Sequence, residues 1–154
     1  MRHGQDCFRY KLTVPFQDID AAGIVFYAHL FRYAHEAYEQ FMREAGCSLH
    51  QLLADGAYLL PLVHAEADYR RPMRHADELH IELRLKRLGQ TSFTLGYRVL
   101  AEYQSEHATL ETVHVAIDRA THRPMTLPDS LRKALARLPA DNDKAAQQDT
   151  AAGK

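Results

Sequence analysis

Apolar and polar residues follow two different periods along this chain, and the period changes early. Over residues 8–14, aromatic and β-branched residues alternate with polar ones, which is typical of a strand. Over residues 27–45, apolar residues instead recur at steps of three and four, and no proline or glycine interrupts them. Gly46 follows the last apolar position, where helices often end. The pattern therefore predicts a strand, a loop over residues 16–23 and one long helix.

After this helix, the alternation typical of strands dominates the chain. Strands are expected over residues 57–70, 78–88, 92–103 and 108–118, and short helices over residues 48–54 and 127–138. The strand over residues 78–88 alternates strictly, with leucines and an isoleucine on one face and charged residues, including Glu82, on the other. Gly89-Gln90 is a turn candidate, and the short gaps between the last three strands favour antiparallel hairpins.

These elements predict one architecture. A single amphipathic helix must bury its apolar face, and the only surface available is the apolar face of the antiparallel sheet. We therefore expect an α+β fold in which a five-stranded antiparallel sheet wraps around one long helix. Unpaired sheet edges are usually covered, so the chain is expected to form a homo-oligomer, a dimer or a tetramer. A single domain is predicted over residues 1–139, and the polar, alanine-rich residues 140–154 are predicted to be a disordered tail.

Composition and charge exclude several classes of protein. Lysine and arginine total 19 against 20 aspartates and glutamates, so the chain lacks the basic excess of a nucleic-acid binder. It has no apolar run of about 18 residues that would span a membrane, and its polar N-terminus lacks a signal peptide, so we expect a cytoplasmic protein. The two cysteines and ten histidines form no metal-binding motif. No metal and no cofactor are therefore expected.

The loop before the long helix carries two carboxylates, Asp18 and Asp20. The first N–H groups of a helix have no partner within it, and the helix dipole favours a negative charge there. An aspartate that caps these groups stabilises a helix by about 1 kcal/mol. On spacing alone, capping is therefore the simpler explanation for both aspartates.

The same arrangement also suits hydrolysis of a thioester. That reaction needs a nucleophile or a base beside the carbonyl carbon, and donors aimed at the developing oxyanion. A carboxylate next to a helix N-terminus supplies both within one short segment. Gly23, which has no side chain, would let a substrate carbonyl approach the backbone closely.

Residues 18–41 read DIDAAGIVFYAHLFRYAHEAYEQF. This string resembles the signature of the 4-hydroxybenzoyl-CoA thioesterase family of hotdog-fold enzymes, D-x-D-x-x-G-[IV]-V-[YFW]-[YH] followed by a long helix, and every fixed position is met. The predicted order of elements also fits a hotdog fold over roughly residues 8–138. The resemblance implies an acyl-CoA thioesterase in which coenzyme A is part of the substrate.

The resemblance also implies a role for each residue of the signature. Asp20 matches the family's nucleophile or general base. Tyr27 matches the residue whose backbone N–H binds the thioester oxygen. Asp18 is given a structural role in holding the loop, and Gly23 matches the glycine of the turn. For Asp20, the resemblance thus favours catalysis over capping.

Two further strings, HEAYE at residues 35–39 and LPLVHA at residues 60–65, are similar to segments of the 1,4-dihydroxy-2-naphthoyl-CoA thioesterases. This similarity indicates an aromatic acyl group, with His35 and His64 as candidate substrate-binding residues. The alternative for each histidine is a partly buried side chain with a backbone partner. Glu36 and Glu39 are interpreted as residues of the helix surface or of an interface, although a related hotdog branch uses a helical carboxylate.

Coenzyme A carries phosphates, so basic residues are expected at the mouth of the pocket. The candidates are Arg70, Arg71, Arg74, Lys86 and Arg87, each with solvated surface as its alternative. In the hydroxybenzoyl-CoA enzymes, cationic residues follow the third strand, whereas this chain has Gly89, Gln90 and Thr91 there. The mode of nucleotide binding therefore departs from the family pattern.

Three rival functions remain open at this point. The acyl group could be a short or medium aliphatic chain. A hotdog hydratase or dehydratase would need a positioned histidine with a second acid, and no such histidine motif precedes the helix. A non-catalytic acyl-binding module would tolerate loss of the loop carboxylate, and the intact DxDxxG string argues against it.

Overall fold

The computed structural model describes residues 7–141. The elements in chain order are β1 (Arg9–Thr13), the 3-10 turn η1 (Phe16–Asp18), α1 (His29–Glu44), α2 (Leu49–Asp55), β2 (Tyr58–Leu59), β3 (Leu62–Tyr69), β4 (Glu78–Leu88), β5 (Ser92–Leu100), the 3-10 turn η2 (Glu102–Gln104), β6 (Glu106–Val115), β7 (Ile117–Asp118) and α3 (Asp129–Leu135). The expected order of a strand, one long helix and then further strands is confirmed.

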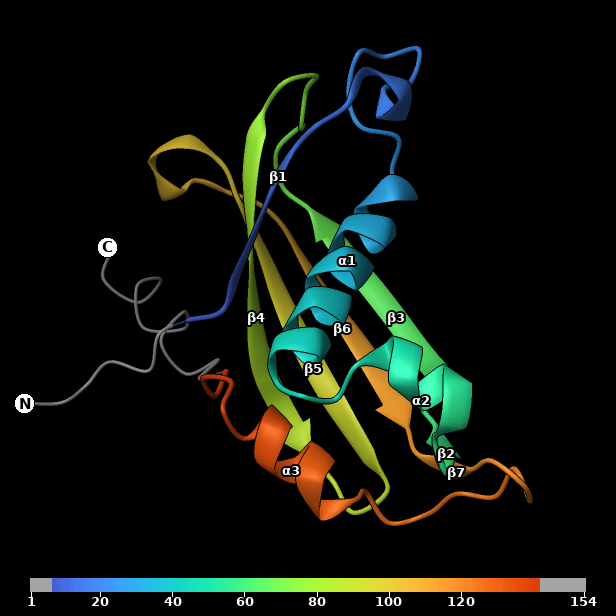
Figure 1. The fold of residues 1–154 in the computed structure, drawn as a ribbon. Helices are drawn as coiled ribbons and strands as arrows, with labels where there is room; N and C mark the ends of the chain where they lie inside the picture. The colour runs from blue at the N-terminus through green and yellow to red at the C-terminus, as the bar shows by residue number, and fades with distance from the viewer. Residues whose placement is uncertain (1–6, 142–154) are drawn as a thin grey trace, which may run out of the picture.

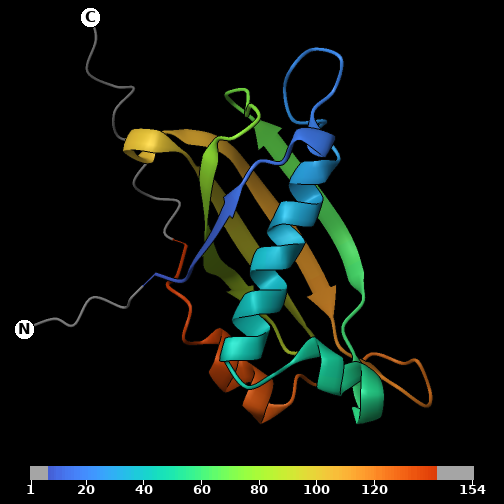
Figure 2. The same cartoon turned by 45° about the horizontal axis from the view of Figure 1, so that its top comes forward.

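Five strands form one antiparallel sheet in the order β1-β4-β5-β6-β3, and α1 crosses one face of it (Figure 1). β2 and β7 pair in a separate two-stranded ribbon. Figure 2 shows α2 and α3 at the end of the sheet opposite to the loop that precedes α1. This arrangement confirms the predicted α+β class and the hotdog fold.

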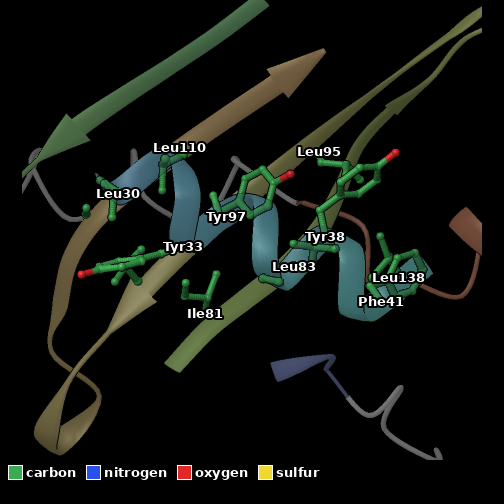
Figure 3. Packing of buried hydrophobic residues seen from close by; sticks show 14 of the residues in the cluster. Leu30, Tyr33, Tyr38, Phe41, Ile81, Leu83, Leu95, Tyr97, Leu110 and Leu138 are labelled. Carbon is green, nitrogen blue, oxygen red and sulfur yellow. The ribbon is translucent and has the colours of Figure 1, made fainter. Parts of the chain in front are cut away.

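The core lies between α1 and the sheet, as Figure 3 shows. The helix buries seven residues at three- and four-residue steps, among them Leu30, Tyr33 and Phe41. They face sheet residues such as Leu83 and Leu95, both fully buried. Burying one such leucine contributes about 2 kcal/mol, so the long helix is held mainly by its apolar stripe.

The end of α1 confirms the role predicted for Gly46. This glycine has φ +80°, a conformation that costs other residues energy. Its N–H donates to Arg43 O at 3.2 Å, and the N–H of Cys47 donates to Met42 O at 2.8 Å. This pair of bonds is a Schellman motif, which satisfies carbonyls that the helix end leaves free.

Three predicted strands differ from the structure: those over residues 57–70 and 108–118 are each broken in the interior, the latter at Ala116, and that over residues 92–103 ends early. The strand over residues 57–70 is interrupted at Leu60 and Pro61, because a proline has no N–H to donate to a sheet. The strand over residues 92–103 ends at Leu100, because Tyr103 has φ +57° in the turn η2, which is incompatible with a strand.

The predicted tail over residues 140–154 lies mainly outside the described residues. Its first two residues are described. Ala140 forms a bridge with Leu85, and the N–H of Asp141 donates to Leu85 O at 3.1 Å. These two residues therefore pair with β4 and are ordered, unlike the tail predicted to begin at residue 140.

Glu82 lies on the predicted charged face of β4, and yet it is only 3% exposed. Its carboxylate lies 2.7 Å from Arg9, 3.3 Å from Arg84 and 3.4 Å from Arg98. The three arginine side chains cover it on the sheet face that points away from α1. A buried carboxylate needs such partners, since an unpaired charge away from water is costly.

A second polar cluster lies beneath α1. The imidazole of His114 stacks on Tyr38 at 4.8 Å and on Phe93 at 5.1 Å between ring centroids. Its Nε2 lies 3.3 Å from Thr112 Oγ1, which in turn lies 3.0 Å from the hydroxyl of Tyr97. Burial lowers the pKa of His114 to about 4, because the charged ring would lose its hydration.

Candidate active site

The loop before α1 folds into a small hairpin. Ile19 and Val25 form an antiparallel bridge, and the N–H of Asp20 donates to Ile24 O at 2.9 Å. The turn closes through the N–H of Gly23, which donates to Asp20 O at 3.0 Å. Gly23 has φ +80°, a conformation that strains residues with a β-carbon, so glycine is favoured at this point. The hairpin therefore gives the DxDxxG string a defined shape.

Asp20 keeps part of its carboxylate available. Its Oδ1 accepts a hydrogen bond from the N–H of Ala22 at 2.8 Å, an Asx turn. Its Oδ2 receives no hydrogen bond or ion pair from any residue between 7 and 141. Asp20 is partly exposed. The side chain is thus held at one oxygen and open to a substrate at the other.

Asp18, two residues earlier, is engaged on all sides and is 4% exposed. Its Oδ2 accepts hydrogen bonds from the guanidinium of Arg32 and, at 2.5 Å, from the hydroxyl of Tyr33. His29 Nε2 lies 3.8 Å from its other oxygen. Burial and the bond to Asp18 raise the pKa of Tyr33, so this phenol remains a donor. Asp18 therefore joins the loop to the first turn of α1.

The N-terminus of α1 is open, and the capping explanation for the two aspartates is wrong. The N-cap residue is Ala28, with helical φ −68° and ψ −26°, and no side chain accepts a hydrogen bond there. The backbone N–H groups of Tyr27 and Ala28 find no acceptor among residues 7–141. The positive end of a 16-residue helix thus presents free donors beside the hairpin.

A strand that is distant in sequence holds this helix start. The hydroxyl of Tyr69, the last residue of β3, donates to Tyr27 O at 2.6 Å. The N–H of Val25 donates to Met73 O at 2.8 Å. Between the two segments lies a hollow of about 250 Å³, lined by Ile24, Val25, Tyr69, Arg70, Arg71, Pro72 and Met73. Sequence reasoning missed Tyr69, because a tyrosine at a strand end has no distinctive pattern.

Four of the five predicted cations fall into two groups, and the fifth, Arg74, lies in the turn before β4, where its N–H donates to Asp77 Oδ2 at 2.8 Å. Arg70 and Arg71 line the hollow beside the hairpin. Lys86 and Arg87 lie near the end of β4 next to α3, at the opposite end of the sheet (Figure 1). Lys86 Nζ is 3.0 Å from Glu111. Of these four, one subunit therefore brings only Arg70 and Arg71 to the hairpin.

The predicted acyl-binding histidines lie outside the hairpin. His35 is exposed on α1, with its ring 5.7 Å from that of Tyr38. His64 is exposed on β3, with Nε2 3.0 Å from Glu66. Within residues 7–141, neither has the backbone partner that the alternative interpretation required.

The helical glutamates make surface contacts. Glu36 accepts a hydrogen bond from the hydroxyl of Tyr10 at 3.0 Å, and Glu39 lies 3.6 Å from Arg43. Among residues 7–141, no group of three or more histidines, cysteines, aspartates or glutamates is arranged to hold a metal ion. In the same residues, no helix has the length and apolar character needed to cross a membrane.

Comparison with known proteins places this geometry among thioesterases. The profile of the thioesterase-like superfamily matches residues 14–135. A 1,4-dihydroxy-2-naphthoyl-CoA hydrolase of Synechococcus elongatus is 37% identical over 126 residues, which are 81% of this chain and 92% of that protein. The crystal structure of a 1,4-dihydroxy-2-naphthoyl-CoA thioesterase from Synechocystis superimposes with a TM-score of 0.79 at 29% identity, covering 84% of this chain and 95% of the other. The structure of a gentisyl-coenzyme A thioesterase superimposes with a TM-score of 0.73 at 28% identity, covering 80% of this chain and 98% of the other.

Proposed function

Since this chain belongs to the thioesterase-like superfamily and is an acyl-coenzyme A thioester hydrolase, we propose that it cleaves an aromatic acyl-CoA, such as a hydroxybenzoyl or dihydroxynaphthoyl ester. The observation that carries the site is the pairing of a half-free carboxylate, Asp20, with an uncapped helix start at Tyr27 and Ala28. Asp18 is 4% exposed and its Oδ2 is held by Arg32 and Tyr33, so the chemistry falls to the more exposed Asp20.

Two routes for Asp20 lead to the same products. In the first, its Oδ2 attacks the thioester carbon, the C–S bond breaks, coenzyme A leaves as the thiolate, and water hydrolyses the resulting anhydride. In the second, Asp20 takes a proton from water as that water attacks the same carbon. In both routes the backbone N–H of Tyr27 stabilises the oxyanion, a contribution worth about 3 kcal/mol for one such donor.

The aromatic acyl group is supported by the relatives. Curated relatives of up to 37% identity are named for dihydroxynaphthoyl-CoA, as is one similar structure, and another similar structure is a gentisyl-CoA thioesterase. We assign His35 and His64 to the acyl end of the substrate, because both are exposed, uncommitted to backbone groups, and able to hydrogen-bond a ring hydroxyl.

A substrate panel tests this function. We expect free thiol to be released from hydroxybenzoyl- and dihydroxynaphthoyl-CoA with kcat/KM about 10- to 100-fold above that for straight-chain acyl-CoA, since pocket shape discriminates by this much. Faster hydrolysis of straight-chain esters would establish the aliphatic alternative. Tight binding of every ester without thiol release would instead indicate an acyl-binding module, and hydration of crotonyl-CoA would indicate a hydratase.

Coenzyme A is proposed to enter at the hollow beside the hairpin. Arg71 forms no ion pair with any residue between 7 and 141, so its guanidinium is available to a phosphate, whereas Arg70 lies 3.2 Å from Glu106. Lys86 and Arg87 could reach the same nucleotide only from another subunit. Arg71→Ala should raise KM about tenfold for the CoA ester and leave KM unchanged for the truncated N-acetylcysteamine thioester. The matched control is Arg123→Ala, far along the chain in the segment before α3; equal effects of both variants would contradict this role.

The edge of β3 supports the proposed homo-oligomer. This strand pairs with β6 on one side only. Its side chains are exposed on both faces apart from the partly buried Ala67, and Leu62 and Val63 are 53% and 59% exposed. Large apolar residues on a free edge favour pairing with a second copy of the same strand. Sedimentation equilibrium should give a molar mass of at least two subunits. The mass of a single subunit at all protein concentrations would exclude the homo-oligomer.

A further inference from the structure

The contact between Tyr69 and the start of α1 has a consequence for catalysis. Tyr69 ends an edge strand, forty-two residues after Tyr27, and its hydroxyl donates to the Tyr27 carbonyl at 2.6 Å. The only other donor to this carbonyl among residues 7–141 is the N–H of Leu30, at the longer distance of 3.3 Å. Burial raises the pKa of Tyr69, which keeps the phenol protonated and able to donate.

The accepting carbonyl belongs to a particular peptide unit. The C=O of Tyr27 and the N–H of Ala28 share one amide, and a hydrogen bond to the oxygen of an amide makes its N–H a stronger donor. The same bond restrains ψ of Tyr27 and therefore the direction of the Ala28 N–H, which lies next to the N–H of Tyr27. Both N–H groups are unpaired among the described residues. Among residues 7–141, no side chain caps this end of the helix.

We propose that Tyr69 is a positioning residue for thioester hydrolysis. Through Tyr27 O, it holds and polarises the amide whose free Ala28 N–H lies beside the Tyr27 N–H, so that both donors face the thioester oxygen. This inference rests on the proposed function. It adds to the site a residue from β3, which lies outside both the loop motif and the helix α1.

The test is Tyr69→Phe, which removes only the hydroxyl. We expect kcat to fall about tenfold, KM to stay within about twofold, and the melting temperature to change little, since weakening an oxyanion donor costs less than deleting one. Tyr103→Phe is the matched control, because Tyr103 is 99% exposed and should leave kcat unchanged. A loss of kcat that follows a loss of folded protein would show a merely structural role and overturn the proposal.

A spectroscopic measurement separates this inference from the proposed function. The probe is an acyl-CoA analogue in which a methylene replaces sulfur, so that the carbonyl remains and no thiol can leave. Its infrared C=O stretch should shift to lower frequency when the analogue binds to the wild type. The shift should be smaller when it binds to Tyr69→Phe. If the wild type releases no thiol from any ester, the proposed function fails. If the wild type is active and Tyr69→Phe retains both kcat and the carbonyl frequency, the role of Tyr69 alone is overturned.

Discussion

Replacing Asp20 by asparagine lowers kcat for thioester hydrolysis by about 1,000-fold or more and leaves the fold intact. An amide is neither a nucleophile nor a base at neutral pH, so both routes proposed for Asp20 are lost. The fold survives because the amide oxygen of asparagine can still accept the hydrogen bond from the N–H of Ala22, now 2.8 Å from Asp20 Oδ1. Thiol release under saturating substrate measures kcat, and thermal unfolding measures the fold.

A matched control for Asp20 exists in the same chain. Asp118 also accepts a backbone N–H two residues ahead, from Ala120 at 2.9 Å, on a turn remote from the hairpin. Asp118→Asn should therefore leave kcat unchanged. Asp18→Asn should lower the melting temperature, because it removes the charge that Arg32 faces at the loop. Wild-type turnover in Asp20→Asn would show that this carboxylate carries no part of the reaction.

The long helix and the sheet could be predicted because their signals are local and repeated. The three- and four-residue spacing that ends at Gly46 predicts α1 to within two residues. The alternation around Leu79 and Ile81 predicts the buried face of β4. The limits of the strands were harder to predict from the sequence. The break at Pro61, for example, depends on which neighbouring strand this segment pairs with.

The site could be predicted only in part, because some of its contacts depend on the tertiary fold. The hairpin motif identified Asp18 and Asp20, but the rule for helix capping assigned them the wrong structural role. That rule assumes that the nearest aspartate turns back onto the helix N–H groups. In the structure Asp18 instead accepts from the side chains of Arg32 and Tyr33. Contacts of this kind join segments whose closeness depends on the tertiary fold, as does the bond from Tyr69.

The buried histidine beneath α1 should make the protein sensitive to acid. His114 is 4% exposed, and its pKa is lowered from an ordinary value of about 6.5 to about 4. Its contribution to stability is therefore fully present above pH 6.5. As the pH falls below 6.5, the unfolded chain binds a proton that the folded chain refuses, and the loss continues until about pH 4. We expect the free energy of unfolding to fall by about 2 kcal/mol between pH 7 and pH 5 from this group alone.

The variant His114→Gln isolates this contribution. Glutamine does not titrate, and its amide can still hydrogen-bond the hydroxyl of Thr112, now 3.3 Å from the ring. Urea unfolding at pH 7 and pH 5 gives the difference for each protein, and other titrating groups cancel between them. The wild type should lose about 2 kcal/mol more than His114→Gln. His50→Gln is the control, since this histidine is exposed on α2 and should leave the acid-induced loss in place. An equal loss in the wild type and in His114→Gln would mean that the buried ring accepts its proton without unfolding.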